Sequence, residues 1–178
     1  MGDPERSVLP DYCRKPVVVL GCGNVLFGDD GFGCAVVGYI EKRVRVPSHV
    51  CLVDAGTGAR KLLFTLCLSR RVPRRLLIVD AIDAARAPGE LFEVRPSEIP
   101  AVKRDDFSMH QLPTSDMLRE LQELRGVEVR VLACQTGPLP QVVRPGLSDP
   151  VRGALAKAAA WISEEYFGPL PGEGSAGD

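Results

Sequence analysis

The chain has 178 residues, of which 45% are hydrophobic and 25% are charged, and its formal net charge is −1. This length and balance are typical of one globular domain with a single core. The near-zero net charge gives no electrostatic reason to expect nucleic acid or an anionic membrane as a partner. No run approaches the roughly 20 apolar residues that span a bilayer. We therefore expect neither a nucleic-acid-binding nor a membrane protein.

The first residues and the cysteines favour a cytoplasmic location. Residues 1–16 carry acids and prolines instead of the continuous apolar region of a signal peptide. The six cysteines are scattered, and no two of them form a C-x-x-C pair. Free buried thiols behave as small apolar side chains. We expect structural cysteines in a reducing cytosol, in preference to a thiolate metal site.

Composition also predicts the domain organisation. We expect an N-terminal extension at residues 1–15, a single domain at 16–167 and a flexible tail at 168–178. The tail has too little apolar surface to fold by itself. We expect the chain to act as a monomer.

In chain order, short β-branched runs alternate with longer amphipathic segments. They predict a buried strand at 16–20, a helix at 31–43, a strand at 50–54, a helix at 60–69 and a strand from 75 to about 80. This order predicts an α/β fold, a three-layer sandwich with helices on both faces of a twisted sheet. We expect that sheet to be mostly parallel and to have five or six strands.

The second half of the chain is less regular. After the Pro88-Gly89 turn, residues 90–96 alternate in the manner of an edge strand. The later elements are a polar loop at 100–111, a helix at 113–125, a strand at 126–134, a proline-rich loop at 135–146 and a last helix to about 166. Ser148 or Asp149 is predicted to cap that last helix, with Pro150 at its first position.

Carboxylates stand where three of the predicted parallel strands end. Asp29 and Asp30 follow the first strand, Asp54 closes the second and Asp80 closes the third. In open α/β sheets, ligands bind outside the carboxyl ends of the strands. We therefore expect these groups on one rim. His110 lies in the polar loop, and the pattern of elements only allows it to reach that rim.

The loop at 21–33, GCGNVLFGDDGFG, favours a cation. Its glycines permit positive φ and close backbone approach. Asp30 falls near the start of a helix, where the helix dipole stabilises negative charge by about 0.3–1 kcal/mol. An ionised Asp30 is a good ligand for a divalent cation. The alternative is that Asp29 and Asp30 only cap the helix, and Asn24 is expected to brace the loop through its side chain.

Other enzyme classes fit this loop less well. A dinucleotide fingerprint wants Gly or Ala where Leu26 stands, and two acids would repel a pyrophosphate. The chain has no G-K-S/T segment of a nucleotide P-loop. It also lacks the G-x-S-x-G and H-E-x-x-H motifs of serine hydrolases and zinc proteases. An unrelated nucleotide enzyme on a similar scaffold remains the alternative from a different class.

Four blocks of the sequence resemble those of the hydrogenase maturation proteases and occur in the same order as in that family. The blocks are GCGNVLFGDDGFG at 21–33, DAGTGA at 54–59, LIVDAID at 77–83 and SMHQL at 108–112. The resemblance spans roughly residues 17–161. The stretch at 135–151 resembles the branch associated with coenzyme F420-reducing hydrogenases. The resemblance implies an endopeptidase, a hydrolase of aspartic or metal-assisted type, that matures nickel–iron (NiFe) hydrogenases.

This resemblance assigns the metal site to Asp30, Asp80 and His110. Many family members have Glu where this chain has Asp30, so the ligand is one methylene shorter. Two carboxylates and one imidazole suit nickel or zinc without selecting between them. Nickel is expected to arrive with the substrate, and zinc or cadmium could replace it in the free enzyme. The alternatives are a loop histidine bonded to backbone at His110, and a cap of the following turn at Asp80.

The resemblance also implies the catalytic and substrate-binding residues. Asp30 or Asp80 could serve as the base that activates water, or the metal could act as a Lewis acid. Asp54, Gly56 and Thr57 are candidates for contact with the substrate, whereas the structural alternative makes Thr57 a helix cap. For Asp83 the same two alternatives apply, contact with the substrate or a structural role. The arginines of 69–75 are expected to form a solvated face in preference to a docking patch.

The implied reaction is removal of a C-terminal extension from the hydrogenase large-subunit precursor. The precursor would arrive with nickel held by its own thiolates, and Asp30, Asp80 and His110 would complete the coordination of that nickel. Binding the metal would fix the C-terminal peptide in register. The alternative from another class is a nickel-dependent assembly chaperone that holds the precursor without cutting it.

Overall fold

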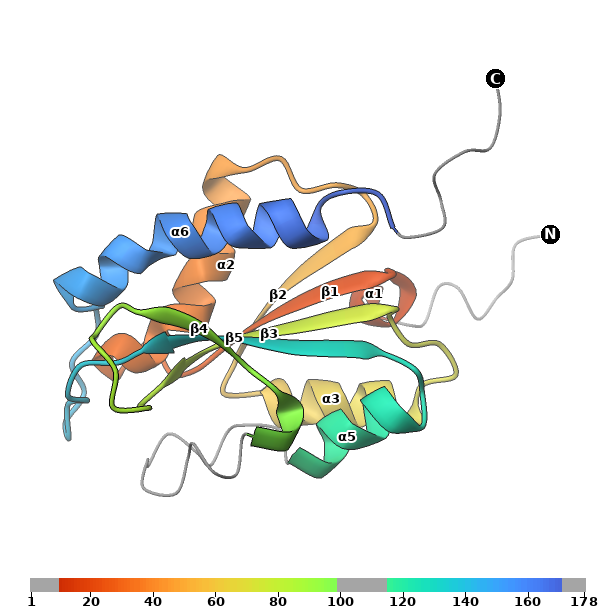
Figure 1. Ribbon diagram of the computed structural model, residues 1–178, viewed down its shortest axis with the longest axis horizontal. Coiled ribbons are helices and arrows are strands. Elements are labelled where there is room, and N and C mark those ends of the chain that lie inside the picture. Colours follow the sequence, from red (N-terminus) through yellow and green to blue (C-terminus); the bar gives the residue numbers. More distant parts are fainter. Residues whose placement is uncertain (1–9, 99–114, 171–178) are drawn as a thin grey trace.

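A five-stranded sheet forms the centre of residues 10–98 and 115–170, the part of the chain that the computed structural model describes (Figure 1). The strand order is β2-β1-β3-β5-β4. Four strands run parallel, namely β1 (Val17–Cys22), β2 (Val50–Gly56), β3 (Arg75–Ile82) and β5 (Glu128–Gln135). The fourth strand in the chain, β4 (Leu91–Val94), pairs antiparallel with β5 at the edge. The predicted mostly parallel sheet and its edge strand are confirmed.

Helices cover both faces of this sheet. On one face lie α2 (Phe32–Arg43) and α6 (Asp149–Tyr166), and on the other lie α3 (Ala59–Leu68) and α5 (Ser115–Glu123) (Figure 1). Alternate residues of β1 feed the two cores: Val17 and Val19 join the cluster under α2 and α6, whereas Val18 and Leu20 join the opposite one. Because both faces are buried, the strand is a continuous apolar run. The predicted three-layer sandwich is confirmed.

Three short elements connect or precede these layers. They are the helix α1 (Asp11–Arg14) and the 3-10 turns η2 (Gly28–Gly31) and η3 (Pro96–Glu98). Cys13 of α1 is buried in the core cluster on the α3 side. The predicted loop at 100–111, which contains His110, lies outside the described residues. Most of the predicted tail, from residue 171, also lies outside them.

The six cysteines are free and mostly buried, as expected of structural thiols. All six are free thiols, and every one except the half-buried Cys51 is buried. Burial raises the pKa of Cys34 and Cys134 to about 12. These thiols therefore stay protonated at neutral pH. In the described ranges, no helix is both long enough and apolar enough to cross a membrane.

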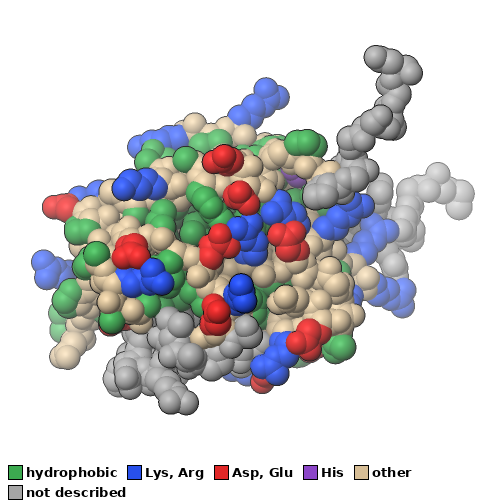
Figure 2. All heavy atoms as spheres, viewed as in Figure 1, with side chains coloured by type: hydrophobic (Ala, Val, Ile, Leu, Met, Phe, Trp, Pro, Cys, Tyr) green, Lys and Arg blue, Asp and Glu red, His purple; other side chains and the backbone are tan. Residues whose placement is uncertain are grey.

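The amino ends of β3 and β5 carry a network of charges, which corrects one prediction. Arg75 was expected on a solvated face, but its side chain is only 15% exposed. Its guanidinium donates to both carboxylate oxygens of Glu128 at 3.1 and 3.3 Å and lies 4.1 Å from the ring centre of Tyr166. Arg130 donates to both oxygens of Glu93 and to Glu165 at 2.8–2.9 Å. Figure 2 shows acidic and basic side chains side by side across the middle of one face.

Candidate active site

Two glycines allow α2 to rest directly on the sheet. A Cβ atom on Gly21 would overlap the carbonyl oxygen of Gly33, and one on Gly33 would overlap the carbonyl oxygen of Val79 in β3. Only residues without side chains permit this approach. The start of α2, with η2 before it, consequently lies at the carboxyl ends of β1 and β3.

Gly23 lies between the segments that carry the predicted carboxylates. Its φ is +121°, and a Cβ atom there would overlap the carbonyl oxygen of Asp30 and lie 3.8 Å from Oδ1 of Asp80. The Gly23 N–H donates to the carbonyl oxygen of Gly56 at 3.1 Å. Through that bond the turn also contacts the loop of Asp54. Asp30, Asp54 and Asp80 therefore lie around one glycine, as the strand-end argument predicted.

Asp30 and Asp80 are buried carboxylates, each 6% exposed. Oδ2 of Asp30 accepts the N–H of Asn24 at 2.9 Å, and Oδ1 of Asp80 accepts the N–H of Ala81 at 2.9 Å. The capping alternative for Asp30 is wrong. The N-cap of α2 is Gly31, with no side-chain bond, and Asp80 lies within β3, which continues to Ile82 instead of ending at Asp80.

Asp29 has a structural role that the sequence did not reveal. Its Oδ1 accepts the N–H of Ser148 at 2.7 Å, and its Oδ2 accepts the N–H of Gly137 and the hydroxyl of Ser148, each at 2.9 Å. It does not cap α2. Ser148 does occupy the predicted N-cap position of α6, but its hydroxyl donates to Asp29 and makes no cap. Asp29 thus ties the start of α6 and the proline-rich loop to η2.

The loop that carries Asp30 pairs with a distant loop at the same rim. The N–H of Gly28 donates to the carbonyl oxygen of Arg144 at 2.9 Å, and the N–H of Arg144 donates to that of Leu26 at 2.8 Å. The side chain of Asn24 accepts the N–H of Leu26 at 3.0 Å, which confirms its predicted bracing role. The pairing with residue 144 depends on tertiary contacts, and no local motif signals it.

The DAGTGA loop places its residues at the rim. Asp54 is exposed, and its Oδ1 accepts the N–H of Gly56 at 3.1 Å, where φ is +49°. Thr57 is exposed and is not a helix cap, because the N-cap of α3 is Gly58. Contact of Asp54, Gly56 and Thr57 with a substrate stays a prediction. Beneath this loop Cys34 lies near Asp54 and donates to the carbonyl oxygen of Gly23 at 3.7 Å.

The predicted third metal ligand, His110, lies outside the described residues. Within 10–98 and 115–170, no group of three or more His, Cys, Asp or Glu side chains is arranged to hold a metal ion. The proposed set of Asp30, Asp80 and His110 therefore stays a prediction. Its two described members, Asp30 and Asp80, both lie next to Gly23.

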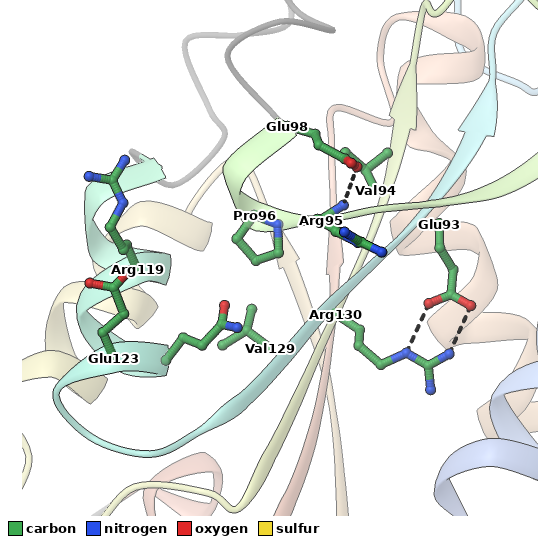
Figure 3. Close-up of a pocket in the computed structure, with 10 residues that line it drawn as sticks. Glu93, Val94, Arg95, Pro96, Glu98, Arg119, Glu123, Val129 and Arg130 are labelled. Atoms are coloured by element: carbon green, nitrogen blue, oxygen red, sulfur yellow. Dashed lines mark hydrogen bonds and ion pairs between the residues drawn. The ribbon is translucent and has the colours of Figure 1, made fainter.

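Two pockets lie on different parts of the molecule. One, of about 390 Å³, is lined by residues that follow β3 and β5, namely Asp83, Pro88, Thr136, Gly137, Pro138 and Leu139. The other, of about 640 Å³, lies between η3, α5 and β5, and Figure 3 shows Glu93 and Arg130 paired at its edge. In the register of β3 and β5, Arg130 is opposite Leu77, three residues before Asp80. The second pocket therefore belongs to the amino half of the sheet and not to the rim.

Comparison with known proteins identifies the family. Residues 34–165 match the family described as hydrogenase maturation protease. A protein of Methanocaldococcus jannaschii, named as a candidate hydrogenase maturation protease, is 38% identical over 153 residues, which are 85% of this chain and 97% of that protein. Coenzyme F420 hydrogenase subunit delta of Methanothermobacter thermautotrophicus is 34% identical over 153 residues, 84% and 93% of the two chains.

A solved structure gives the same result. The hydrogenase maturating endopeptidase HybD from Escherichia coli is similar with a TM-score of 0.61 and 29% identity, over 84% of this chain and 93% of HybD. The chain belongs to the hydrogenase maturation protease family.

Proposed function

We propose that this protein is an endopeptidase that removes the C-terminal extension of a nickel-loaded large-subunit precursor of a nickel–iron hydrogenase. It recognises the nickel, which is part of the substrate, through Asp30, Asp80 and His110. It acts in the cytoplasm as a monomer. Zinc or cadmium could occupy the same ligands in the free enzyme.

One observation carries this proposal. Two buried aspartates, fifty residues apart in the chain, both lie next to Gly23 at the carboxyl ends of parallel strands, Asp30 through its carbonyl oxygen and Asp80 through its carboxylate oxygen Oδ1. Such a pair, joined by one imidazole, forms a mixed oxygen and nitrogen set with positions left for other ligands. Those positions suit a metal that already holds thiolates from a client. The family membership supplies the reaction class, peptide hydrolysis during hydrogenase maturation.

In this mechanism the rim holds the client by its metal, so hydrolysis becomes effectively intramolecular. Water adds its oxygen to the carbonyl carbon of the scissile bond, the carbon–nitrogen bond breaks, and a proton passes to the departing amine. Two routes can activate the water, namely the client's nickel as a Lewis acid or a carboxylate as a general base. A carboxylate that binds the metal is a weaker base, because the cation stabilises its ionised form.

The test is incubation of this protein with a purified large-subunit precursor, prepared from cells that lack it, in nickel-loaded and nickel-free forms. We expect mass spectrometry to show loss of a C-terminal peptide from the loaded form alone. A stable complex without any product would favour the chaperone. Saturable micromolar binding of NAD, FAD or ATP in a parallel titration would favour a nucleotide enzyme.

A further inference from the structure

A second feature of the rim is the pocket of about 390 Å³ between the loops that follow β3 and β5. The N–H of Thr136 donates to the carbonyl oxygen of Ile82 at 3.2 Å, which extends the pairing of the two strands into the pocket wall. Pro88, Pro138 and Leu139 supply apolar surface, and Asp83 supplies a carboxylate. The pocket is therefore an open hollow of mixed lining, with two prolines and a leucine beside an acid.

The pocket is linked through the chain to the carboxylates described above. Asp83 follows Asp80 by three residues, which is about 10 Å along an extended chain. On the other wall, the N–H of Gly137 donates to Asp29, the neighbour of Asp30. An extended peptide held at Asp30 and Asp80 would therefore bring a side chain about three residues away to the mouth of the pocket.

The loop that carries Asp83 is held in one conformation by a buried amide. Gln135 is 3% exposed, and its Oε1 accepts the N–H groups of Ala84 at 2.7 Å and Arg86 at 3.1 Å. Its Nε2 donates to Oδ1 of Asp83 at 2.9 Å and to the carbonyl oxygen of Thr136 at 2.8 Å. One side chain thus joins the two walls of the pocket and satisfies all of its own polar atoms.

Between the two N–H groups held by Gln135 lies a residue in a rare conformation. Ala85 has φ of +56°, and among the described residues it alone combines a side chain with positive φ. Such backbone strain persists only where surrounding contacts over-determine it, and it is concentrated at binding sites and active sites. Here the Ala85 N–H donates to Oδ1 of Asp83 at 3.0 Å, so the strained turn orients that carboxylate.

The carboxylate of Asp83 is suited to a cationic ligand. The bonds from Gln135 and Ala85 hold the pKa of Asp83 below its usual range, so it is ionised at neutral pH. Both of these bonds fall on Oδ1, and no residue in the described ranges donates to Oδ2. A ligand with an aliphatic stem and a cationic end could cover the prolines and pair with that oxygen.

We propose that this pocket receives an arginine or lysine side chain of the client's C-terminal segment, with Asp83 as the residue that selects it. The proposal rests on the proposed function, because the client peptide must lie along the rim. It adds a specificity determinant separate from the nickel site.

The test uses nuclear magnetic resonance of the ¹⁵N-labelled full chain, titrated with N-acetyl-arginine amide, N-acetyl-lysine amide and the neutral isostere N-acetyl-citrulline amide. We expect saturable shifts at the amides of Ala84, Ala85 and Gly137 with the two cations, and about fivefold weaker binding of the citrulline compound, the scale of one exposed ion pair. Asp83→Asn should abolish that preference. It retains Oδ1 as an acceptor, so the loop should stay folded.

The matched control is Asp116→Asn, a neutralised acid on α5 whose side chain is 83% exposed, which should bind as the parent does. Equal binding of cationic and neutral ligands, or an unchanged preference in Asp83→Asn, would overturn the pocket assignment. In the precursor assay, Asp83→Asn should raise KM about fivefold with kcat unchanged. Selective cation binding without any cleavage would instead defeat the proposed function while the pocket stands.

Discussion

Charged side chains have different partners at the amino and carboxyl ends of the parallel strands. At the amino end, Arg75 and Arg130 pair with glutamates and lie against the rings of Tyr166 and Trp161. At the carboxyl end, the aspartates accept hydrogen bonds from backbone N–H groups, as Asp30 does from Asn24 and Asp80 from Ala81. The contacts described at the amino end are therefore ion pairs between distant side chains, whereas those described at the carboxyl end are hydrogen bonds from nearby backbone N–H groups.

This difference indicates that the two ends of the parallel strands, called the amino edge and the carboxyl edge below, have different functions. The amino edge fastens β3, β4 and β5 to α6 through paired charges. At the carboxyl ends of the strands, Asp30, Asp54 and Asp80 lie around the Gly23 turn, in the position where ligands bind in open α/β sheets. We therefore expect substitutions at the carboxyl edge to affect processing and substitutions at the amino edge to affect only stability.

The largest expected effect comes from removing the proposed nickel ligands. Asp30→Asn, Asp80→Asn and His110→Ala should each lower kcat/KM for the loaded precursor by at least about a hundredfold, as expected when a group that stabilises the transition state is lost. Glu128→Gln, which breaks a pair at the amino edge, is the control and should process normally. A fully active His110→Ala protein would refute the three-ligand site.

The second-largest effect is expected at the turn of Gly23. Gly23→Ala places a Cβ atom against the carbonyl oxygen of Asp30 in a backbone of φ +121°, so it should destabilise the fold by at least about 3 kcal/mol. Urea unfolding measures this loss. Gly153→Ala is the matched control, because Gly153 lies in α6 with open space around it and should gain about 0.5–1 kcal/mol. A Gly23→Ala protein as stable as the parent would show that the turn can relax.

A third test separates the two neighbouring aspartates. Asp29→Ala removes the acceptor for three donors and should cost about 2–3 kcal/mol of unfolding free energy. Ser148→Ala removes only the hydroxyl and should cost about 1 kcal/mol. Both can be measured by urea unfolding. Equal losses in the two variants would contradict the assignment of Asp29 as the tie between η2 and α6.

The smallest effect is expected at the amino edge. Arg130→Met keeps the aliphatic stem and removes the pairs with Glu93 and Glu165, all of them partly exposed. It should cost about 1 kcal/mol or less, with a deficit that shrinks as salt screens the parent's ion pairs. Thermal unfolding at low and high salt measures this. Loss of processing in Arg130→Met would contradict the expectation that substitutions at the amino edge affect only stability.

Local patterns predicted the layers and the strand-end carboxylates because they depend on periodicity and on the geometry of parallel sheets. They placed the end of β3 at Asp80, although pairing with β5 carries the strand to Ile82. They could not assign Asp29, whose partners are more than a hundred residues away in the chain. Arg75 was misplaced because its burial depends on Tyr166 and Glu128, which no local window contains.

The tie made by Asp29 has a mechanical consequence. Asp29 and Asp30 are consecutive, so only one peptide unit separates the α-carbon of the residue that binds Gly137 and Ser148 from that of the residue proposed to face nickel. A client that displaces the proline-rich loop would therefore also displace Asp30, through Asp29 and the rigid peptide bond between them. Docking at the proline-rich loop and the orientation of the Asp30 carboxylate would then be coupled.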